Sequence, residues 1–193
     1  MKLKQLYQKY ERYQKYEWYQ KYEREILLVI ITLFFLIPYF TINHFTIYKN
    51  NNQLDTILDE LLPFLSGFIL IYLTSYILVF IPYFFVKEKK YFRRIILAYF
   101  ITLSISYIIF LIYPVKIIRP EITSESFFSQ LTKLFYELDY PYNNFPSLHV
   151  TLSFLSAGVC TKYNQKYWWL FLWAGAIALS TLLVKQHYVL DVL

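Results

Sequence analysis

The stretch Ile95–Tyr113, which reads IILAYFITLSISYIIFLIY, contains no charged residue and is long enough to cross a membrane as one helix. A similar uncharged stretch, Leu61–Phe85, precedes it, and another, Tyr167–Val184, follows it. These segments should be helical because lipid offers the backbone no hydrogen-bond partners. A soluble protein of 193 residues could not enclose several such blocks in one core. The sequence therefore predicts an integral membrane protein.

Two shorter apolar blocks complete the predicted bundle. Ile26–Ile42 is marginal for a span, and Leu148–Cys160 is short for one. The short block need not cross the whole hydrocarbon layer if Pro146 and Ser147, which precede it, lie in a recess lined by protein. We therefore expect an all-α polytopic membrane helix bundle with five spans.

The charged residues set the expected orientation. The formal net charge of +6 invites a nucleic-acid partner, but the basic residues are distributed by side of the membrane. Fourteen lysines and arginines fall on the side of the N-terminus and five on the other side. The positive-inside rule then places the N-terminus in the cytoplasm and the opposite face outside it. The single Cys160 excludes an internal disulfide and suggests neither a metal cluster nor a redox pair.

We divide the chain into a cytoplasmic head, residues 1–25, and a membrane-embedded domain, residues 26–193. The head repeats a hexapeptide, since Tyr7–Arg12 recurs as Tyr13–Trp18 and Tyr19–Arg24 with one substitution. Such a biased segment supports only a compositional interpretation, so we predict solubility and anchoring for it.

The longest polar connection, residues 114–146, contains an expected amphipathic helix. Six apolar residues recur there at helical spacing with polar residues between them, namely Phe127, Phe128, Leu131, Leu134, Phe135 and Leu138. We expect this helix to lie on the membrane surface, where it either covers a site or simply joins two spans. Asp139, which follows it, is typical of a solvated loop acid.

The segment Pro146-Ser147-Leu148-His149 opens the fourth apolar block. Ser147 is a suitable N-cap residue, so His149 should sit in the first turn of a helix. The start of a helix offers unpaired N–H groups and a partial positive charge, which suits a phosphate group. We therefore predict an anion-binding site near His149.

Near the end of the chain, His187 and Asp191 are four residues apart and so share one face if that segment is helical. A carboxylate beside an imidazole fixes its tautomer and stabilises its cation. The other ring nitrogen is then available as a nucleophile or base. Arg119, His149 and His187 all fall on the face opposite the N-terminus. Each histidine alone could be an ordinary packing residue, but ionisable residues inside a membrane are usually functional.

Together these residues resemble the type 2 phosphatidic acid phosphatase superfamily. The matches are Arg119-Pro120 to the end of its first motif, Pro146–His149 to its second, and Ser180, His187 and Asp191 to its third. Phe145–His149 and Gln186–Tyr188 are most similar to the inositol phosphorylceramide synthase-like branch. The chain departs from the phosphatase pattern at Thr181, where that branch has arginine, and Lys185 is a candidate substitute.

The resemblance implies a bundle of six helices, of which this chain would contain five spans and the start of a sixth. Because the chain stops at Leu193, within what should be that sixth helix, we expect a fragment or a truncated product. The resemblance also implies a histidine mechanism that uses no metal and no cofactor. His187 would attack phosphorus, Asp191 would orient it, and His149 would act as general acid and then base. The implied phosphate-binding residues are Arg119, Lys116, Ser147 and Lys185.

Three functions stay open on this sequence. A lipid phosphatase would transfer the phosphoryl group of a membrane lipid to water, and a phosphotransferase would transfer it to a polyol or another alcohol. A transporter or degenerate scaffold would retain the fold without the reaction. The expected partners are a lipid substrate and the bilayer, with no nucleic acid.

Overall fold

The computed structural model describes the backbone of residues 2–49 and 51–192 and the side chains of residues 17–49 and 51–192. The described residues form helices and connecting segments, without a β-strand. The α-helices are α1 (Lys2–Thr46), α2 (Ile57–Leu61), α3 (Ile69–Phe85), α4 (Lys89–Ile112), α5 (Phe127–Leu138), α6 (Leu148–Tyr163), α7 (Leu170–Leu183) and α8 (Val189–Val192). Short 3₁₀ turns at Ser66–Phe68 and Gln165–Tyr167 lead into α3 and α7. The predicted all-α class is confirmed over these residues.

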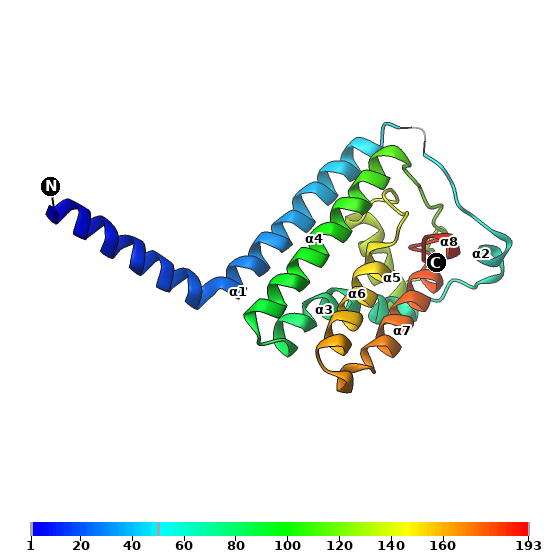
Figure 1. The fold of residues 1–193 in the computed structure, drawn as a ribbon. Coiled ribbons are helices and arrows are strands. Elements are labelled where there is room, and N and C mark those ends of the chain that lie inside the picture. Colours follow the sequence, from blue (N-terminus) through cyan, green and yellow to red (C-terminus); the bar gives the residue numbers. More distant parts are fainter. Residues whose placement is uncertain (1, 50, 193) are drawn as a thin grey trace.

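The long helices pack side by side as a bundle (Figure 1). α6 contacts α3, α4 and α7, and α1 packs along α4. The first part of α1 projects away from the bundle and bends at Tyr22, where the backbone leaves helical geometry. Beyond this bend, Glu23 forms an ion pair with Arg93 of α4, and Arg24 lies over the ring of Tyr83 at the end of α3. These contacts fasten α1 to the turn between α3 and α4.

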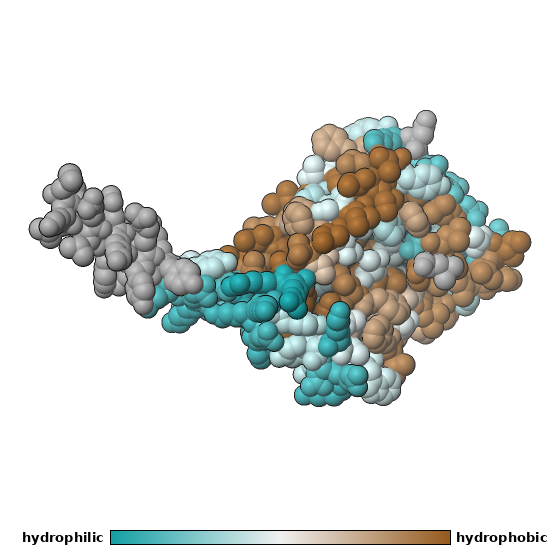
Figure 2. Space-filling model, viewed as in Figure 1, coloured by the Kyte–Doolittle hydropathy of each residue, from teal (hydrophilic) through white to brown (hydrophobic). Residues whose placement is uncertain are grey.

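Four helical segments are long and apolar enough to cross a membrane, namely Glu17–Thr46, Ser66–Phe85, Lys89–Ile112 and Gln165–Leu183. They coincide with four of the five predicted spans and indicate an integral multi-pass membrane protein. Figure 2 shows apolar side chains over the bundle and hydrophilic ones at the end where α3 turns into α4 and α6 into α7. The other predicted span corresponds to α6, whose 16 residues are not among the four segments. The number of spans therefore stays a prediction.

Neighbouring helices surround α6, which explains why this segment is short and less apolar. Ser153 and Ser156 are fully buried on it, and each hydroxyl donates to the carbonyl four residues earlier. Ser156 also hydrogen-bonds the hydroxyl of Tyr99 in α4 at 2.6 Å. Small and polar residues are suited to helix–helix contacts in membranes because they allow close approach and bind across the interface.

The amphipathic helix predicted over residues 127–138 is confirmed by α5. Ser126 caps it by accepting a hydrogen bond from the backbone N–H of Ser129. Ser129 and Thr132 face inward, and the Ser129 hydroxyl contacts that of Ser66 at 3.2 Å. Leu131 and Phe135 of α5 pack with Ile69, Tyr72 and Val184, whereas Phe127, Leu134 and Leu138 are exposed. α5 thus packs against the first turn of α3, and its other apolar side chains are exposed on the outside of the bundle.

The connections between helices meet at one end of the bundle and are hydrogen-bonded to one another. Asn52 donates its N–H to the carbonyl of Pro114 at 2.9 Å and accepts from the N–H of Lys116. The N–H of Leu65 donates to the carbonyl of Leu183, again at 2.9 Å. Segments distant in sequence are therefore fixed relative to one another at this end.

The contact between α6 and α7 provides a test of the packing. Ala174 is fully buried in a cluster with Leu78, Ala157, Cys160, Leu170 and Ile177. Ala174→Leu should destabilise the protein by about 1–3 kcal/mol because the interface has no room for the added carbons. Thermal unfolding in detergent micelles measures this effect. Leu172→Phe, on the exposed face of the same helix, is the matched control. An unchanged melting temperature for Ala174→Leu would contradict the packing described.

Candidate active site

Two histidines from distant parts of the chain meet at the end where the connections gather. His149 lies in the first turn of α6, and His187 follows α7. His149 Nδ1 is 3.3 Å from His187 Nε2, and the ring centroids are 5.6 Å apart. The sequence predicted both positions, and the structure brings the two rings into contact.

Asp191 lies on the far side of the His187 ring. Its Oδ2 is 3.5 Å from His187 Nδ1, and the same oxygen accepts the backbone N–H of Tyr188 at 2.8 Å. The prediction that His187 and Asp191 share one face of a helix is wrong in detail, because α8 begins at Val189 and His187 therefore precedes it. Lys185, with φ of 52°, turns the chain after α7, and this turn presents His187 to Asp191. The two side chains therefore approach each other through a turn followed by a single helical turn.

Ser147 caps α6, as predicted, and ties the two histidine segments together. Its hydroxyl accepts the N–H of Val150, and its own N–H donates to the carbonyl of Asp191 at 3.0 Å. A second link runs from the Asn144 side-chain amide to the carbonyl of Gln186 at 2.8 Å. Ser147 is fully buried and does not line the cavity described below.

Arg119 lies beside the histidines and is held by several partners. Its Nη1 donates to the carbonyls of Tyr136 and Asp139 at 2.9 and 2.7 Å, and its Nη2 donates to Oε1 of Gln186. The guanidinium carbon is 4.6 Å from the centre of the Tyr136 ring. Burial lowers the pKa of Arg119, and the nearby Asp139 carboxyl opposes that effect. An arginine nevertheless stays protonated in a protein, so this end of the site keeps a positive charge.

Asp139 corrects a prediction, since it is not a solvated loop acid. Its Oδ1 accepts the hydroxyl of Tyr39 in α1 at 2.7 Å. Burial raises the pKa of the Asp139 carboxyl, while the bond from Tyr39 and the charge of Arg119 act in the opposite direction. No local sequence pattern indicates this contact, because Tyr39 and Asp139 are a hundred residues apart.

Two further polar residues at the site were not among those assigned a role from the sequence. Gln186 is 2% exposed, and its Nε2 has no hydrogen-bond partner among the described residues. Tyr72 in α3 places its hydroxyl 2.9 Å from His149 Nε2. Gln186 lies within a motif that the sequence already marked, whereas nothing in the apolar α3 segment distinguished Tyr72.

The two lysines proposed to bind phosphate lie elsewhere. Lys185 Nζ donates to the carbonyls of Asp59 and Leu62 at 2.6 and 2.7 Å, which anchors the segment around α2. Lys116 Nζ lies 5.5 Å from the centre of the Tyr142 ring. Neither lysine lines the cavity, so their part in phosphate binding stays a prediction that the geometry does not favour.

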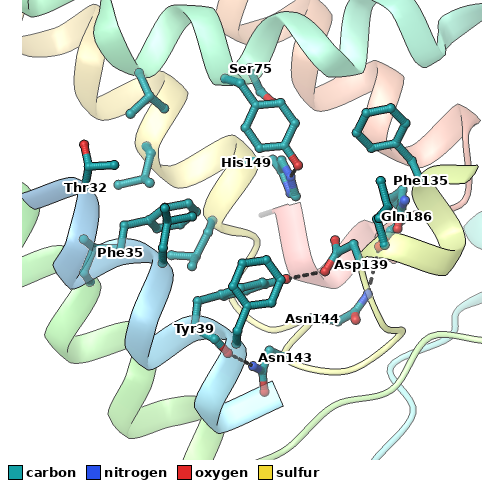
Figure 3. Close-up of a pocket in the computed structure, with 18 of the residues that line it drawn as sticks. Thr32, Phe35, Tyr39, Ser75, Phe135, Asp139, Asn143, Asn144, His149 and Gln186 are labelled. Carbon is teal, nitrogen blue, oxygen red and sulfur yellow. Dashed lines mark hydrogen bonds between the residues drawn. The ribbon is translucent and has the colours of Figure 1, made fainter. Parts of the chain in front are cut away.

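A cavity of about 380 Å³ opens beside the histidines. At one end it is lined by polar residues, namely Tyr39, Arg119, Asp139, Asn144, His149, Gln186 and His187. Its remaining wall consists mainly of apolar side chains from α1, α3 and α4, such as Ile31, Phe35, Val79 and Leu103. Figure 3 shows His149, Asp139 and Gln186 around the cavity, with Phe35 and Thr32 further along it. The cavity therefore offers a charged end and a long apolar end.

Comparison with protein families gives a match. The family model described as PAP2 superfamily matches residues 90–193, which is more than half of the chain. No curated protein and no solved structure matches the chain. The matched region contains Arg119, His149, His187 and Asp191. The chain therefore belongs to the PAP2 superfamily.

Proposed function

We propose that this protein is a metal-independent lipid phosphatase or phosphotransferase that works through a phosphohistidine intermediate. The observation that carries the proposal is the contact of His149 with His187, 3.3 Å apart, next to Arg119 at the polar end of the cavity. Members of the superfamily typically are metal-independent phosphatases, which supports the reaction type.

The geometry supports a two-step mechanism. A phosphoryl group that enters between the two rings would replace their contact and place His187 Nε2 for attack on phosphorus. Asp191 would stabilise the positive charge that develops on the His187 ring. His149 would protonate the leaving alcohol and then activate the incoming water or alcohol as a base. Arg119 and the free amide N–H groups of Gln186 would bind the phosphoryl oxygens.

A lipid substrate fits the shape and polarity of the cavity. Most of its lining is apolar and comes from α1, α3 and α4, which are membrane-span candidates. A lipid could extend its hydrocarbon chains along that wall while its phosphate reaches Arg119, because apolar pockets with a few convergent polar groups orient amphipathic ligands. The excess of lysine and arginine on the N-terminal side supports a location of this end of the bundle outside the cytoplasm, with the N-terminus inside.

The charge of the site favours a phosphodiester donor. Among the described residues that line the cavity, Arg119 is the only lysine or arginine, and the carboxyl of Asp139 is close enough to act on its charge. A phosphomonoester carries nearly two negative charges at neutral pH, whereas a diester carries one. A site with one guanidinium beside a carboxyl matches the single charge of a diester better than the nearly double charge of a monoester. This match, together with the motifs Phe145–His149 and Gln186–Tyr188, favours headgroup transfer of the kind made by the inositol phosphorylceramide synthase-like branch.

Loss of the nucleophile tests the mechanism. His187→Gln should reduce turnover by at least about 10³-fold, because no other group in the site can take its place at phosphorus. The assay is release of labelled phosphate or formation of a labelled ester by protein reconstituted in liposomes. His44→Gln, which changes an exposed histidine of α1, is the matched control. Retained turnover in His187→Gln would remove the mechanism, and transport activity insensitive to the substitution would favour a non-catalytic role.

Substitutions can distinguish which of the proposed phosphate-binding residues contribute to catalysis. Arg119→Ala should lower kcat/KM by about 10²–10³-fold, as the loss of a group that stabilises transition-state charge typically does. Lys116→Ala and Lys185→Ala should change kcat/KM by less than about threefold, since neither lysine lines the cavity. The melting temperature of each variant shows whether the protein is folded in the assay. If a folded lysine variant lost as much kcat/KM as Arg119→Ala, the phosphate-binding role predicted for that lysine from the sequence would be restored.

The choice of donor can be measured directly. Liposomes would carry a phospholipid labelled in its phosphate, either a phosphodiester or phosphatidic acid, with and without inositol or another polyol. We expect a new labelled ester from the diester, formed with a kcat/KM at least about tenfold above that for hydrolysis of phosphatidic acid, because an unmatched charge costs on the order of 1 kcal/mol or more. Faster release of free phosphate from phosphatidic acid would identify a phosphatase instead.

A further inference from the structure

Two tyrosines of α3 hold the side of the His149 ring that faces away from His187. The Tyr72 hydroxyl lies 2.9 Å from His149 Nε2, and that of Tyr76 lies 3.3 Å from the same nitrogen. Tyr72 is fully buried, whereas Tyr76 is 40% exposed and lines the cavity. α3 ends before the region that matches the PAP2 superfamily, residues 90–193, so that match assigns these tyrosines no role.

The chain of contacts fixes where each proton lies when both histidines are neutral. Asp191 Oδ2 lies 3.5 Å from His187 Nδ1, and a carboxylate beside this nitrogen favours the tautomer that carries its proton there and has a lone pair on Nε2. His149 Nδ1, which faces that lone pair, must then be the donor in their contact. His149 Nε2 is consequently an acceptor, and the hydroxyl of Tyr72 is the donor that satisfies it.

We propose that Tyr72 is a positioning residue for the general acid: its hydroxyl keeps the proton of neutral His149 on Nδ1 and supplies a proton to Nε2 when the first one leaves. The inference rests on the proposed function, because it requires a leaving alcohol to be protonated. Burial supports it, since a hydroxyl without access to water needs an acceptor within the protein, and His149 Nε2 lies 2.9 Å from it.

The first step then balances within the site. The lone pair of His187 Nε2 forms the N–P bond, the bond from phosphorus to the leaving oxygen breaks, and that oxygen takes the Nδ1 proton of His149. The Tyr72 hydroxyl proton moves to His149 Nε2 at the same time, so the ring never becomes an imidazolate, and Tyr72 is left as a phenolate. The net change is the transfer of one proton from Tyr72 to the leaving alkoxide.

The second step restores the starting state. The incoming water or alcohol loses its proton to His149 Nδ1 as its oxygen bonds to phosphorus, and the N–P bond breaks to return the lone pair to His187. The proton on His149 Nε2 returns to the Tyr72 phenolate. The cycle needs no proton from solvent in its first step.

The test compares Tyr72→Phe with the wild-type protein in pre-steady-state formation of the phosphoenzyme. Tyr107→Phe is the matched control, because the hydroxyl of Tyr107 is also buried but donates to the carbonyls of Phe34 and Phe35, and Tyr107 does not line the cavity. With an alkyl phosphoester, Tyr72→Phe should form the phosphoenzyme about a hundredfold more slowly. With a nitrophenyl phosphoester, whose leaving group needs no proton, the change should stay within about threefold, as expected for loss of acid catalysis alone.

The pH profile separates proton supply from packing. In Tyr72→Phe, solvent must first protonate His149, so the rate with the alkyl ester should rise by up to about tenfold for each unit of decreasing pH. The wild-type protein and Tyr107→Phe should show no such rise over the same range. Equal losses on both esters with an unchanged pH profile would reduce Tyr72 to a structural role and overturn the inference.

A second measurement avoids substitution if Tyr72→Phe does not fold. The rate of phosphoenzyme formation by wild-type protein is followed in mixtures of H₂O and D₂O, where two moving protons predict a curved dependence on the deuterium fraction. A linear dependence, which indicates one moving proton, would overturn the inference. Turnover that survives in His187→Gln would instead remove the proposed function, whatever the result at Tyr72.

Discussion

The contact between two imidazoles from separate helices is the interaction on which the site depends. Hydrogen bonds to backbone carbonyls hold it. The backbone N–H of Ser147 donates to the carbonyl of Asp191, and the side-chain amide of Asn144 donates to the carbonyl of Gln186. These bonds join the start of α6 to the turn after α7. The histidine pair is therefore positioned by two connections that rigid helices present to each other, and its geometry does not rest on the side chains alone.

Buried polar groups in an apolar bundle need partners, and that requirement explains the surrounding shell. Arg119 binds two carbonyls and the Gln186 amide oxygen, and Asp139 accepts from Tyr39. Each of these bonds reduces the cost of placing a charged or polar group away from water. Nε2 of Gln186 has no partner among the described residues, and Gln186 lines the polar end of the cavity. The cavity thus joins an incompletely satisfied polar end to a wall suited to hydrocarbon.

The sequence was informative wherever the signal was local. Uncharged runs located four segments able to span a membrane, the 3.6-residue period located α5, and the cap at Ser147 located the start of α6. It also located Arg119 and the two histidines, because their motifs are contiguous. It could not predict that Lys185 turns toward Asp59, that Asp139 meets Tyr39, or that Tyr72 reaches His149, since each contact joins residues far apart in the chain. Direction and pairing of side chains are tertiary properties, so residue type and spacing do not determine them.

The central claim concerns which atom carries the phosphoryl group between the two steps. Rapid quenching of wild-type protein in liposomes during turnover, followed by proteolysis under alkaline conditions and mass spectrometry, locates that group. The account predicts an acid-labile phosphoramidate on the peptide that contains His187. A phosphoryl group on another residue, or complete turnover without any phosphorylated peptide, would contradict it.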